Sequence, residues 1–417
     1  MSVLEGSHIT IVTQYYWPEH VGIAPYSTRL AEHLAERGAA VNVVTAMPHY
    51  PSWRIEPDRY RRLDLHEERR GVRVHRLWHY IPQRQSAARR AGYEASFFAH
   101  ALLRHAPQSD AVVGVIPSLS AGAIARTYAR RRNCRYGIVV QDLLAQGARQ
   151  SGITKMDAVG SATRALERWV MHAATRVAVV SERFQPHVED AGVAGDRICV
   201  LRNWVEVERA SLATPSPEEA ARRRQELGWR DDEFVVLHAG NMGLKQGLEF
   251  VVDAARRARE RALPIRFVLM GDGSQRPAIE DAASDLANLQ IIPNRPRDEC
   301  SRIMAVADVL LVNERRTVVD MALPSKLTSY FVAGRPVLAA VTDDGTTAQE
   351  IRRANGGLVV SPEDADALVD GVLTLTSDPE LGTRLSSNAA AYASQELSAE
   401  RVLLEAEQFV GAILGGS

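Results

Sequence analysis

The sequence predicts an α/β protein that contains two doubly wound parallel sheets. Short apolar and β-branched runs alternate with longer amphipathic stretches, which is typical of βαβ units. The runs are apolar throughout, as expected for strands that are covered by helices on both faces. The same alternation starts again after residue 230. We therefore expect two such domains.

The first half begins with a strand at residues 9–13. An amphipathic helix follows, in which Leu30 and Leu34 lie one turn apart and Gly38 marks the end. The remaining strands expected in this half are residues 41–45, 111–115, 138–141, 177–181 and 198–201.

The second half begins with a strand at residues 234–239 and a helix at residues 248–262. A final amphipathic helix is expected at residues 398–414. Residues 208–224 contain Ser, Thr and two prolines, so this segment is the expected linker. The other strands expected are residues 267–270, 290–292, 309–312, 337–341 and 357–360.

Composition restricts the class of protein. The chain has 417 residues, 46% of them hydrophobic and 24% charged, and a formal net charge of -1. The length suits two or three domains, and the near-neutral charge argues against nucleic acid as a partner. Cys134, Cys199 and Cys300 lie far apart without CxxC spacing. This favours a reducing cytoplasm and gives no support for disulfides or a zinc site.

Membrane and export signals are not expected. The N-terminal stretch lacks the pattern of a signal peptide, and no apolar run approaches the roughly 18 residues of a membrane span. We expect a soluble protein, or at most one that lies on a membrane surface.

In open parallel sheets, ligands bind beyond the carboxyl ends of the strands, and the cleft between two such domains is the expected site. After the first strand, Gly22 precedes a helix, where a backbone amide can approach an anion. The alternative is an ordinary βα turn, which the position of the glycine alone favours. The loop is not GxGxxG, which disfavours an NAD-dependent oxidoreductase.

In the second half, Gly240, Gly243 and Gly247 surround Lys245 just before a helix. Flexible backbone and one cation at a helix start are suited to a diphosphate. The alternative is a solvated lysine.

Two further loops follow the same pattern. Gly271 and Asp272 form a sharp turn after a strand, and Ser325 and Lys326 open a helix after a proline. A helix start offers backbone amides to an anion. A simple turn and a capped helix are the alternatives.

Together these loops resemble a known family. The segments PEHVGIAPYSTRLAEHLAERG, HAGNMGLKQGLE, MGDGSQR and LPSKLTSYFVAGRPV occur in this order. They are similar to motifs of the retaining family-four glycosyltransferases of the GT-B fold, in particular the colanic-acid and exopolysaccharide branch. The resemblance covers nearly the whole chain.

The resemblance implies two Rossmann-like domains that face a cleft. Residues 1–205 would bind the acceptor, residues 206–395 would bind the nucleotide sugar, and the helix within residues 396–417 would cross back onto the first domain. The donor would be a UDP- or GDP-sugar, with no further cofactor.

The resemblance also implies a donor site. Asn241 stands where the wider family has an arginine, and Asn294 and Arg295 fall where the family packs backbone against the nucleobase. The expected donor-binding residues are Gly22, Gly240, Asn241, Lys245, Gly271, Asp272, Asn294, Arg295, Ser325 and Lys326.

Two departures affect the catalytic residues. The family's E-x7-E signature would fall on Met321 and Ser329, neither of which is acidic, and the adjacent Asp320 could replace the first. A family histidine is replaced by Gln141–Asp142. Asp142 is expected to contact the acceptor or the reacting sugar, with a helix cap or turn as the alternative. The expected catalytic residues are Asp142, Lys245 and Asp320.

The expected acceptor-binding residues are His20, His49, Gln141 and Asp142. His49 follows the second strand, but a lone histidine is more often structural. No histidine pair has HxxxH or facial-triad spacing, so no metal is expected.

Arginines are dense between residues 59 and 90, with Trp78 and Tyr80 among them. Such a region can contact an anionic membrane leaflet and would suit a lipid-linked acceptor. A solvated surface is the alternative.

The expected activity is transfer of a sugar from a nucleoside diphosphate to a hydroxyl acceptor with retention of configuration. The acceptor could be a saccharide, a lipid-linked saccharide or a small natural product. A cytoplasmic protein is expected, either free or at the inner face of the membrane. The alternatives are an epimerase or hydrolase of the same fold and a non-catalytic nucleotide-sugar binding protein.

Overall fold

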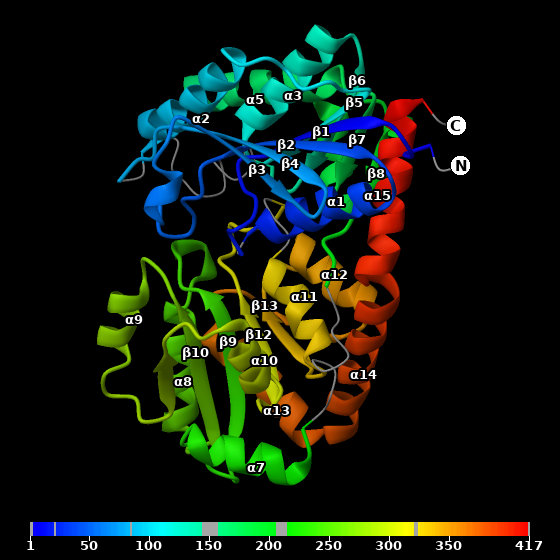
Figure 1. Ribbon diagram of the computed structural model, residues 1–417. Helices are drawn as coiled ribbons and strands as arrows, with labels where there is room; N and C mark the ends of the chain where they lie inside the picture. Colours follow the sequence, from blue (N-terminus) through cyan, green and yellow to red (C-terminus); the bar gives the residue numbers. More distant parts are fainter. Residues whose placement is uncertain are drawn as a thin grey trace. The chain divides into compact units, whose positions relative to one another are not determined.

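The computed structural model describes residues 3–20, 22–83, 86–143, 157–205, 215–320 and 324–415. The chain divides into two compact units (Figure 1). Unit 1 comprises residues 1–203 together with 400–417, and unit 2 comprises residues 204–399. Each unit is built around one sheet, so the prediction of two doubly wound domains is confirmed.

The sheet of unit 1 has the strand order β3-β4-β2-β1-β5-β6-β7-β8. All its pairs are parallel except β3 with β4. The strands are β1 (His8–Val12), β2 (Ala40–Ala46), β3 (Asp64–Arg69), β4 (Val72–Leu77), β5 (Ala111–Ile116), β6 (Arg135–Val140), β7 (Arg176–Val179) and β8 (Ile198–Val200). The helices described are α1 (Ala24–Glu36), α2 (Ala87–Leu102), α3 (Leu119–Arg132), α5 (Asp157–His172), α6 (Gln185–Asp190) and α15 (Ala399–Leu414).

The β3–β4 hairpin at the sheet edge was not predicted, because its residues were interpreted as an arginine-dense surface. Edge strands commonly carry charges, which discourage pairing with other chains. Arg76 is buried and pairs with Glu67 at 2.5 Å. Arg69 and Arg70 pair with Glu32 of α1 at 2.7 and 3.0 Å. Neither expected role, lipid contact or simple solvation, therefore describes Arg76 or Arg69, whereas the Arg70 side chain pairs with Glu32 but is 66% exposed.

The C-terminal helix α15 is part of unit 1, as the predicted crossing back requires. It lies against α1, where His33 Nε2 is 2.7 Å from Glu407 Oε1 (Figure 1). It also packs closely on β6. A Cβ atom at Gly137 would lie 2.3 Å from Ile413 Cδ1 and 2.9 Å from Phe409 Cζ, so only glycine permits this approach.

The sheet of unit 2 is parallel throughout and has the order β11-β10-β9-β12-β13-β14. This order places a topological switch point between β9 and β12, where ligands bind in such folds. The strands are β9 (Phe234–Asn241), β10 (Ile265–Asp272), β11 (Leu289–Ile292), β12 (Val309–Asn313), β13 (Val337–Ala340) and β14 (Gly357–Val360).

Helices cover both faces of this sheet, and an apolar core lies on each face. The helices are α7 (Pro217–Glu226), α8 (Glu249–Glu260), α9 (Arg276–Ala282), α10 (Arg297–Met304), α11 (Ser325–Val332), α12 (Thr346–Ala354), α13 (Ala365–Ser377) and α14 (Pro379–Glu396).

The prediction of a linker over residues 208–224 is wrong for its last part, which forms α7. Ser216 and Glu219 form a capping box that starts this helix. Residues 206–214 lie outside the described residues.

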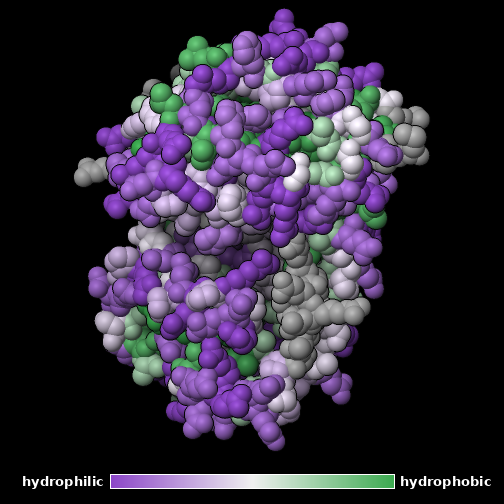
Figure 2. Space-filling model, viewed as in Figure 1, coloured by the Kyte–Doolittle hydropathy of each residue, from purple (hydrophilic) through white to green (hydrophobic). Residues whose placement is uncertain are grey.

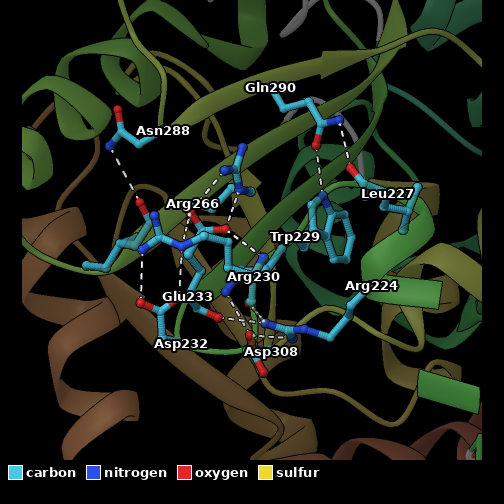
Figure 3. A network of polar contacts seen from close by, with 12 residues as sticks. Arg224, Leu227, Trp229, Arg230, Asp232, Glu233, Arg266, Asn288, Gln290 and Asp308 are labelled. Atoms are coloured by element: carbon cyan, nitrogen blue, oxygen red, sulfur yellow. Dashed lines mark hydrogen bonds and ion pairs between the residues drawn. The ribbon is translucent and has the colours of Figure 1, made fainter. Parts of the chain in front are cut away.

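A polar network fixes α7 at the amino ends of the strands of unit 2 (Figure 3). Arg224 donates to Asp308 at 2.9 Å, and Arg266 binds Glu233 through two hydrogen bonds of 2.7 and 2.9 Å. Trp229 donates to Gln290 at 2.8 Å. These interactions stabilise the end of the sheet opposite to the ligand edge.

Hydrophilic residues predominate on the face shown in Figure 2. Among the described residues, none of the helices combines the length and the apolarity that crossing a bilayer requires.

The fold predicts a strong difference between two glycines. Gly271 has a φ of +152°, and an added Cβ would lie 1.8 Å from the carbonyl oxygen of Gly240 on the neighbouring strand. We expect Gly271→Ala to lower the free energy of unfolding by on the order of 3 kcal/mol or more. Urea unfolding followed by circular dichroism measures this change.

Gly382→Ala is the matched control. Gly382 lies in α14, and a Cβ there would have no neighbour within 4 Å. Alanine should therefore stabilise the helix by roughly 0.5 kcal/mol. Similar stability losses in both variants would contradict the described packing of β9 on β10.

Candidate functional site

Several of the predicted donor-site residues of unit 2 lie together at the carboxyl edge of its sheet. β9 and β10 are paired up to their last residues, with Gly240 opposite Gly271 and Asn241 opposite Asp272. The turn that carries Lys245 follows β9 directly. Gly240, Gly271, Asn241 and Asp272 are thus brought together at the carboxyl ends of β9 and β10, and β9 is one of the two strands that flank the switch point.

Lys245 lies on a turn that neighbouring residues hold in place. Asn313, at the end of β12, donates from its side-chain amide to the carbonyl oxygens of Gln246 and Gly247 at 2.7 and 2.9 Å. The backbone amide of Arg315 donates to the carbonyl oxygen of Lys245 at 2.9 Å. The Lys245 side chain is exposed on this fixed turn, so it is accessible to an anionic ligand.

Lys326, in the first turn of α11, contacts His238 inside β9. The distance from Lys326 Nζ to His238 Nε2 is 3.1 Å. His238 is fully buried, and burial, reinforced by Lys326, holds its pKa well below the usual range. The imidazole is therefore neutral, and its Nε2 can accept a hydrogen bond from the lysine.

Gly240 leaves the space that the ammonium group of Lys326 needs. A Cβ at this position would lie 3.3 Å from Lys326 Cε and 3.4 Å from Nζ. Gly240 and Lys326, both predicted to bind the donor, therefore lie next to each other.

A buried carboxylate completes this edge. Glu314 follows β12, and Thr347 Oγ1 donates to it at 2.9 Å. Burial raises the pKa of Glu314, while Thr347, Lys245 and Lys326 lower it. Burial lowers the pKa of Lys326 to about 7; Glu314 opposes this shift and Lys245 adds to it. Lys245, Lys326 and Glu314 therefore interact electrostatically. Two positive groups face one carboxyl group here, so the site is suited to binding an anion, which would supply further negative charge.

The sequence analysis did not identify Glu314 as a site residue. An available signal was the polar pair Asn313–Glu314 directly after an apolar strand. The contact between His238 and Lys326 had no local signal, because 88 residues separate them.

The remaining predicted residues of unit 2 lie in different settings. Asp320 is half-buried and accepts a hydrogen bond from Thr346 Oγ1, at the start of α12, at 3.3 Å. Asn294 and Arg295 are exposed in the loop before α10, and Ser325 is exposed at the start of α11. Of the two E-x7-E positions, Met321 lies outside the described residues and the second is exposed in α11. The roles of these residues stay predictions.

In unit 1, Glu19 joins the loops that follow β1 and β2. Its buried carboxylate accepts hydrogen bonds from the backbone amides of His49 and Tyr50, each at 2.8 Å. Burial raises the pKa of Glu19 to about 7, although these amides oppose the shift. Gly22 has a φ of +62° just before α1, and its predicted contact with a diphosphate stays a prediction.

His49 is not an exposed loop residue. Its Nδ1 is 3.0 Å from the carbonyl oxygen of Met47, its Nε2 is 2.9 Å from Tyr93 Oη, and its ring lies 4.5 Å from that of His79. Burial lowers its pKa to about 4. The contacts favour the structural alternative over direct acceptor binding.

Asp142 and Gln141 follow β6 at the carboxyl edge of the sheet of unit 1. Gln141 is buried, whereas Asp142 is half-buried and His20 is exposed. Burial raises the pKa of Tyr50, and the charges of Glu19 and Asp142 raise it further. Loops after three strands therefore place Glu19, Tyr50 and Asp142 in one electrostatic neighbourhood.

Within the described ranges, no group of three or more His, Cys, Asp or Glu side chains is arranged to hold a metal ion.

The pKa of Lys326 predicts a pH-dependent stability. Between pH 7 and the ordinary lysine pKa of 10.5, the folded protein binds fewer protons than the unfolded chain. The contribution of Lys326 to stability therefore rises with pH across this window. The variant Lys326→Met lacks this gain. The difference in free energy of unfolding between the native protein and Lys326→Met should therefore grow, in favour of the native protein, by on the order of 2 kcal/mol from about pH 7 to about pH 10. Urea unfolding at both pH values measures it.

Arg302→Met, at an exposed position of α10, is the control and should show the pH dependence of the native protein. Parallel pH curves for the native protein and Lys326→Met would contradict the lowered pKa.

Sequence comparison relates the chain to glycosyltransferases. Residues 21–204 match the family model of the glycosyl transferase 4-like domain, and residues 219–392 match that of glycosyl transferases group 1. The putative colanic acid biosynthesis glycosyl transferase WcaI of Escherichia coli (strain K12) is 30% identical over 412 residues, which cover 96% of this chain and 98% of that protein. The α-D-kanosaminyltransferase of Streptomyces kanamyceticus is 28% identical over 40% of this chain and 44% of its own.

Solved structures share the fold. A sucrose-phosphate synthase from Thermosynechococcus elongatus has a TM-score of 0.74 and 18% identity, covering 99% of this chain and 100% of its own. Alr3699/HepE of Anabaena in complex with UDP has a TM-score of 0.71 and 16% identity, and the match covers 97% of this chain and 100% of its own. Because both family models and a relative of nearly full length agree with the architecture, the chain belongs to the family-four glycosyltransferases of the GT-B fold.

Proposed function

We propose that this glycosyltransferase moves a sugar from a nucleoside diphosphate to a hydroxyl acceptor with retention of configuration. The observation that carries the proposal is the placement of Lys245 and Lys326 at the carboxyl edge of the sheet of unit 2, beside the switch point. The Anabaena neighbour is known in complexes with UDP and with UDP-glucose, which supports a donor of this chemistry.

The main barrier is cleavage of the bond between the sugar and the diphosphate. Negative charge develops on the leaving diphosphate, and fixed positive charge lowers this barrier. Lys245 and Lys326 supply ammonium groups, and the first amides of α11, near Ser325, supply backbone donors. His238 holds Lys326 in place, since its Nε2 lies 3.1 Å from the ammonium nitrogen.

Retention follows from attack on the face that the diphosphate leaves. The acceptor oxygen forms the new bond to the sugar while the sugar–phosphate bond breaks, and the acceptor proton passes to the leaving phosphate. Ser329 stands where the family has a glutamate, so the proposal assigns no covalent nucleophile. Asp142 would contact the acceptor or reacting sugar, and Asp320 would act near the donor.

The proposal includes no cofactor and no metal. The base of the donor is uracil or guanine, and the acceptor is a saccharide, a lipid-linked saccharide or a small natural product. The relative named for colanic acid biosynthesis supports a role in polysaccharide synthesis. We place the reaction in the cytoplasm, free or at the inner face of the membrane.

Lys245→Ala should lower kcat/KM for sugar transfer by on the order of 100-fold, because one ammonium group on the leaving diphosphate is lost. Initial rates of nucleoside diphosphate release in the presence of the acceptor measure this loss. Lys245→Arg keeps the charge and should recover part of the rate.

The matched control is Arg302→Ala, which removes an exposed positive charge from α10 of the same unit. Its rate should equal that of the native enzyme. A near-normal rate in Lys245→Ala, with an unchanged circular dichroism spectrum, would contradict the assignment of Lys245 to the leaving diphosphate.

Two measurements test the proposed reaction itself. Calorimetry with a panel of nucleoside diphosphates identifies the base, and proton NMR of the first product identifies the anomeric configuration. An inverted product would refute retention. Consumption of the donor without acceptor would indicate an epimerase or hydrolase, and binding without any turnover would indicate a binding protein.

A further inference from the structure

A groove in unit 1 lies outside the candidate site described above, and Arg61, Arg62 and Trp78 of its lining belong to the arginine-dense region between residues 59 and 90. Its volume is about 600 Å³. We call it the Arg–Trp groove, and the residues that line it are Trp53, Arg54, Ile55, Arg61, Arg62, Leu63, Trp78, Ile81 and Gln83.

Its walls are built by two connected segments. The backbone amide of Trp78 donates to the carbonyl oxygen of Leu63 at 2.8 Å, which extends the β3–β4 hairpin by one pair. The opposite wall follows β2, where the backbone amide of Arg54 donates to the carbonyl oxygen of His49 at 3.2 Å. The groove is thus part of the fold.

The charge of the groove is positive. Three arginines line it, and no carboxylate does. Arg61 pairs with Asp58 at 3.1 Å, and both side chains are largely exposed. Among the residues that the structure describes, the guanidinium groups of Arg54 and Arg62 form no ion pair or hydrogen bond, unlike Arg69, whose partner is Glu32. Two unpaired guanidinium groups are suited to a phosphate.

The rest of the lining is apolar. Five apolar side chains contribute to it, and Trp78 and Leu63 are exposed to 41% and 66%. Gln83 is the one neutral polar side chain in this lining. A sugar needs many neutral hydrogen-bond partners, whereas a hydrocarbon chain needs apolar surface. The combination therefore favours a hydrocarbon chain that carries a phosphate.

The groove is continuous with the predicted acceptor loops. The ring of Trp53 lies 5.8 Å from that of His49 and 6.2 Å from that of Tyr50. The phenol of Tyr50 in turn responds to the charge of Asp142. A ligand in the groove would therefore lie beside the loops predicted to bind the acceptor.

We propose that the Arg–Trp groove binds a lipid phosphate, with the phosphate on Arg54 and Arg62 and the hydrocarbon chain on Trp53, Trp78 and Leu63. The proposal rests on the proposed function, since it makes this lipid the anchor of the acceptor sugar. It selects the lipid-linked class among the acceptors considered above. A concave site of this size suits a single lipid molecule better than a flat bilayer surface.

Binding of monomeric dodecyl phosphate to the full chain tests the proposal. Calorimetry should detect binding that is at least tenfold tighter than that of dodecyl maltoside, which has the same chain on a neutral head, and of glucose 6-phosphate, which lacks the chain. Loss of one charge-assisted contact weakens binding by about tenfold. The double substitution Arg54→Ala and Arg62→Ala should therefore weaken it by about 100-fold, and Trp78→Ala by about tenfold.

Arg73→Ala is the matched control, because Arg73 is exposed on β4 and does not line the groove. Its affinity should equal that of the native protein. Replacing Arg54 and Arg62 by lysine keeps the charge and should retain most of the affinity, and thermal unfolding checks that every variant is folded.

Three results would overturn the proposal. These are equal affinity in the double alanine variant, equal binding of dodecyl maltoside or glucose 6-phosphate, and binding to vesicles containing phosphatidylglycerol without binding to monomeric dodecyl phosphate. The last would indicate a bilayer surface instead.

Lys245→Ala separates the two hypotheses, since Lys245 is in unit 2 and should not affect dodecyl phosphate affinity. Lipid binding without any nucleoside diphosphate binding would refute the proposed function alone. Sugar transfer without lipid binding would refute the groove alone.

Discussion

The candidate site depends on the contact between an ammonium group and a neutral, buried imidazole. Lys326 lies 3.1 Å from His238, and a lysine placed so close to a strand loses hydration. That loss lowers its pKa to about 7. The carboxyl group of Glu314 partly opposes this shift, because it stabilises the charged form of Lys326. Gly240 leaves space for the ammonium group of Lys326. The arrangement leaves positive charge incompletely neutralised within the protein, which is the condition for holding a diphosphate.

The other features of unit 2 support this contact. The pairing of Gly240 with Gly271 brings β9 and β10 together up to their last residues. Asn313 fixes the turn of Lys245 to β12, so two strands that flank the switch point determine where both lysines lie. The network around Arg224 and Asp308 holds the opposite end of the same sheet. A rigid sheet fixed at both ends lets the site keep its geometry while charge develops on a ligand.

The sequence predicted most of the parallel strands, because each of these is a continuous apolar run. It failed for the β3–β4 hairpin, because charged residues such as Arg76 indicate a surface although Arg76 is buried and paired with Glu67. It also failed for α7, because its polar composition is typical of a linker. Site residues were found where a glycine or lysine follows a strand, as for Gly240 and Lys245. The sequence analysis missed Glu314 and left two alternatives for His49, acceptor binding and a structural role. The setting of each residue depends on its burial and on partners that are distant in sequence, Thr347 for Glu314 and Tyr93 for His49.

The choice of basic side chain is itself informative. The chain has 50 lysines and arginines together, and only three of them are lysines, at positions 155, 245 and 326. Two of these three are at the carboxyl edge of the sheet of unit 2. An arginine keeps its charge at every physiological pH and carries a planar fork that is larger than an ammonium group. A lysine is more compact and changes its protonation with its surroundings. In the proposed reaction, an arriving diphosphate raises the pKa of Lys326 again, so that the ligand itself favours the charged form that holds it. Arginine is used where the fold needs permanent ion pairs, as in the hairpin, and where the Arg–Trp groove keeps permanent positive charge.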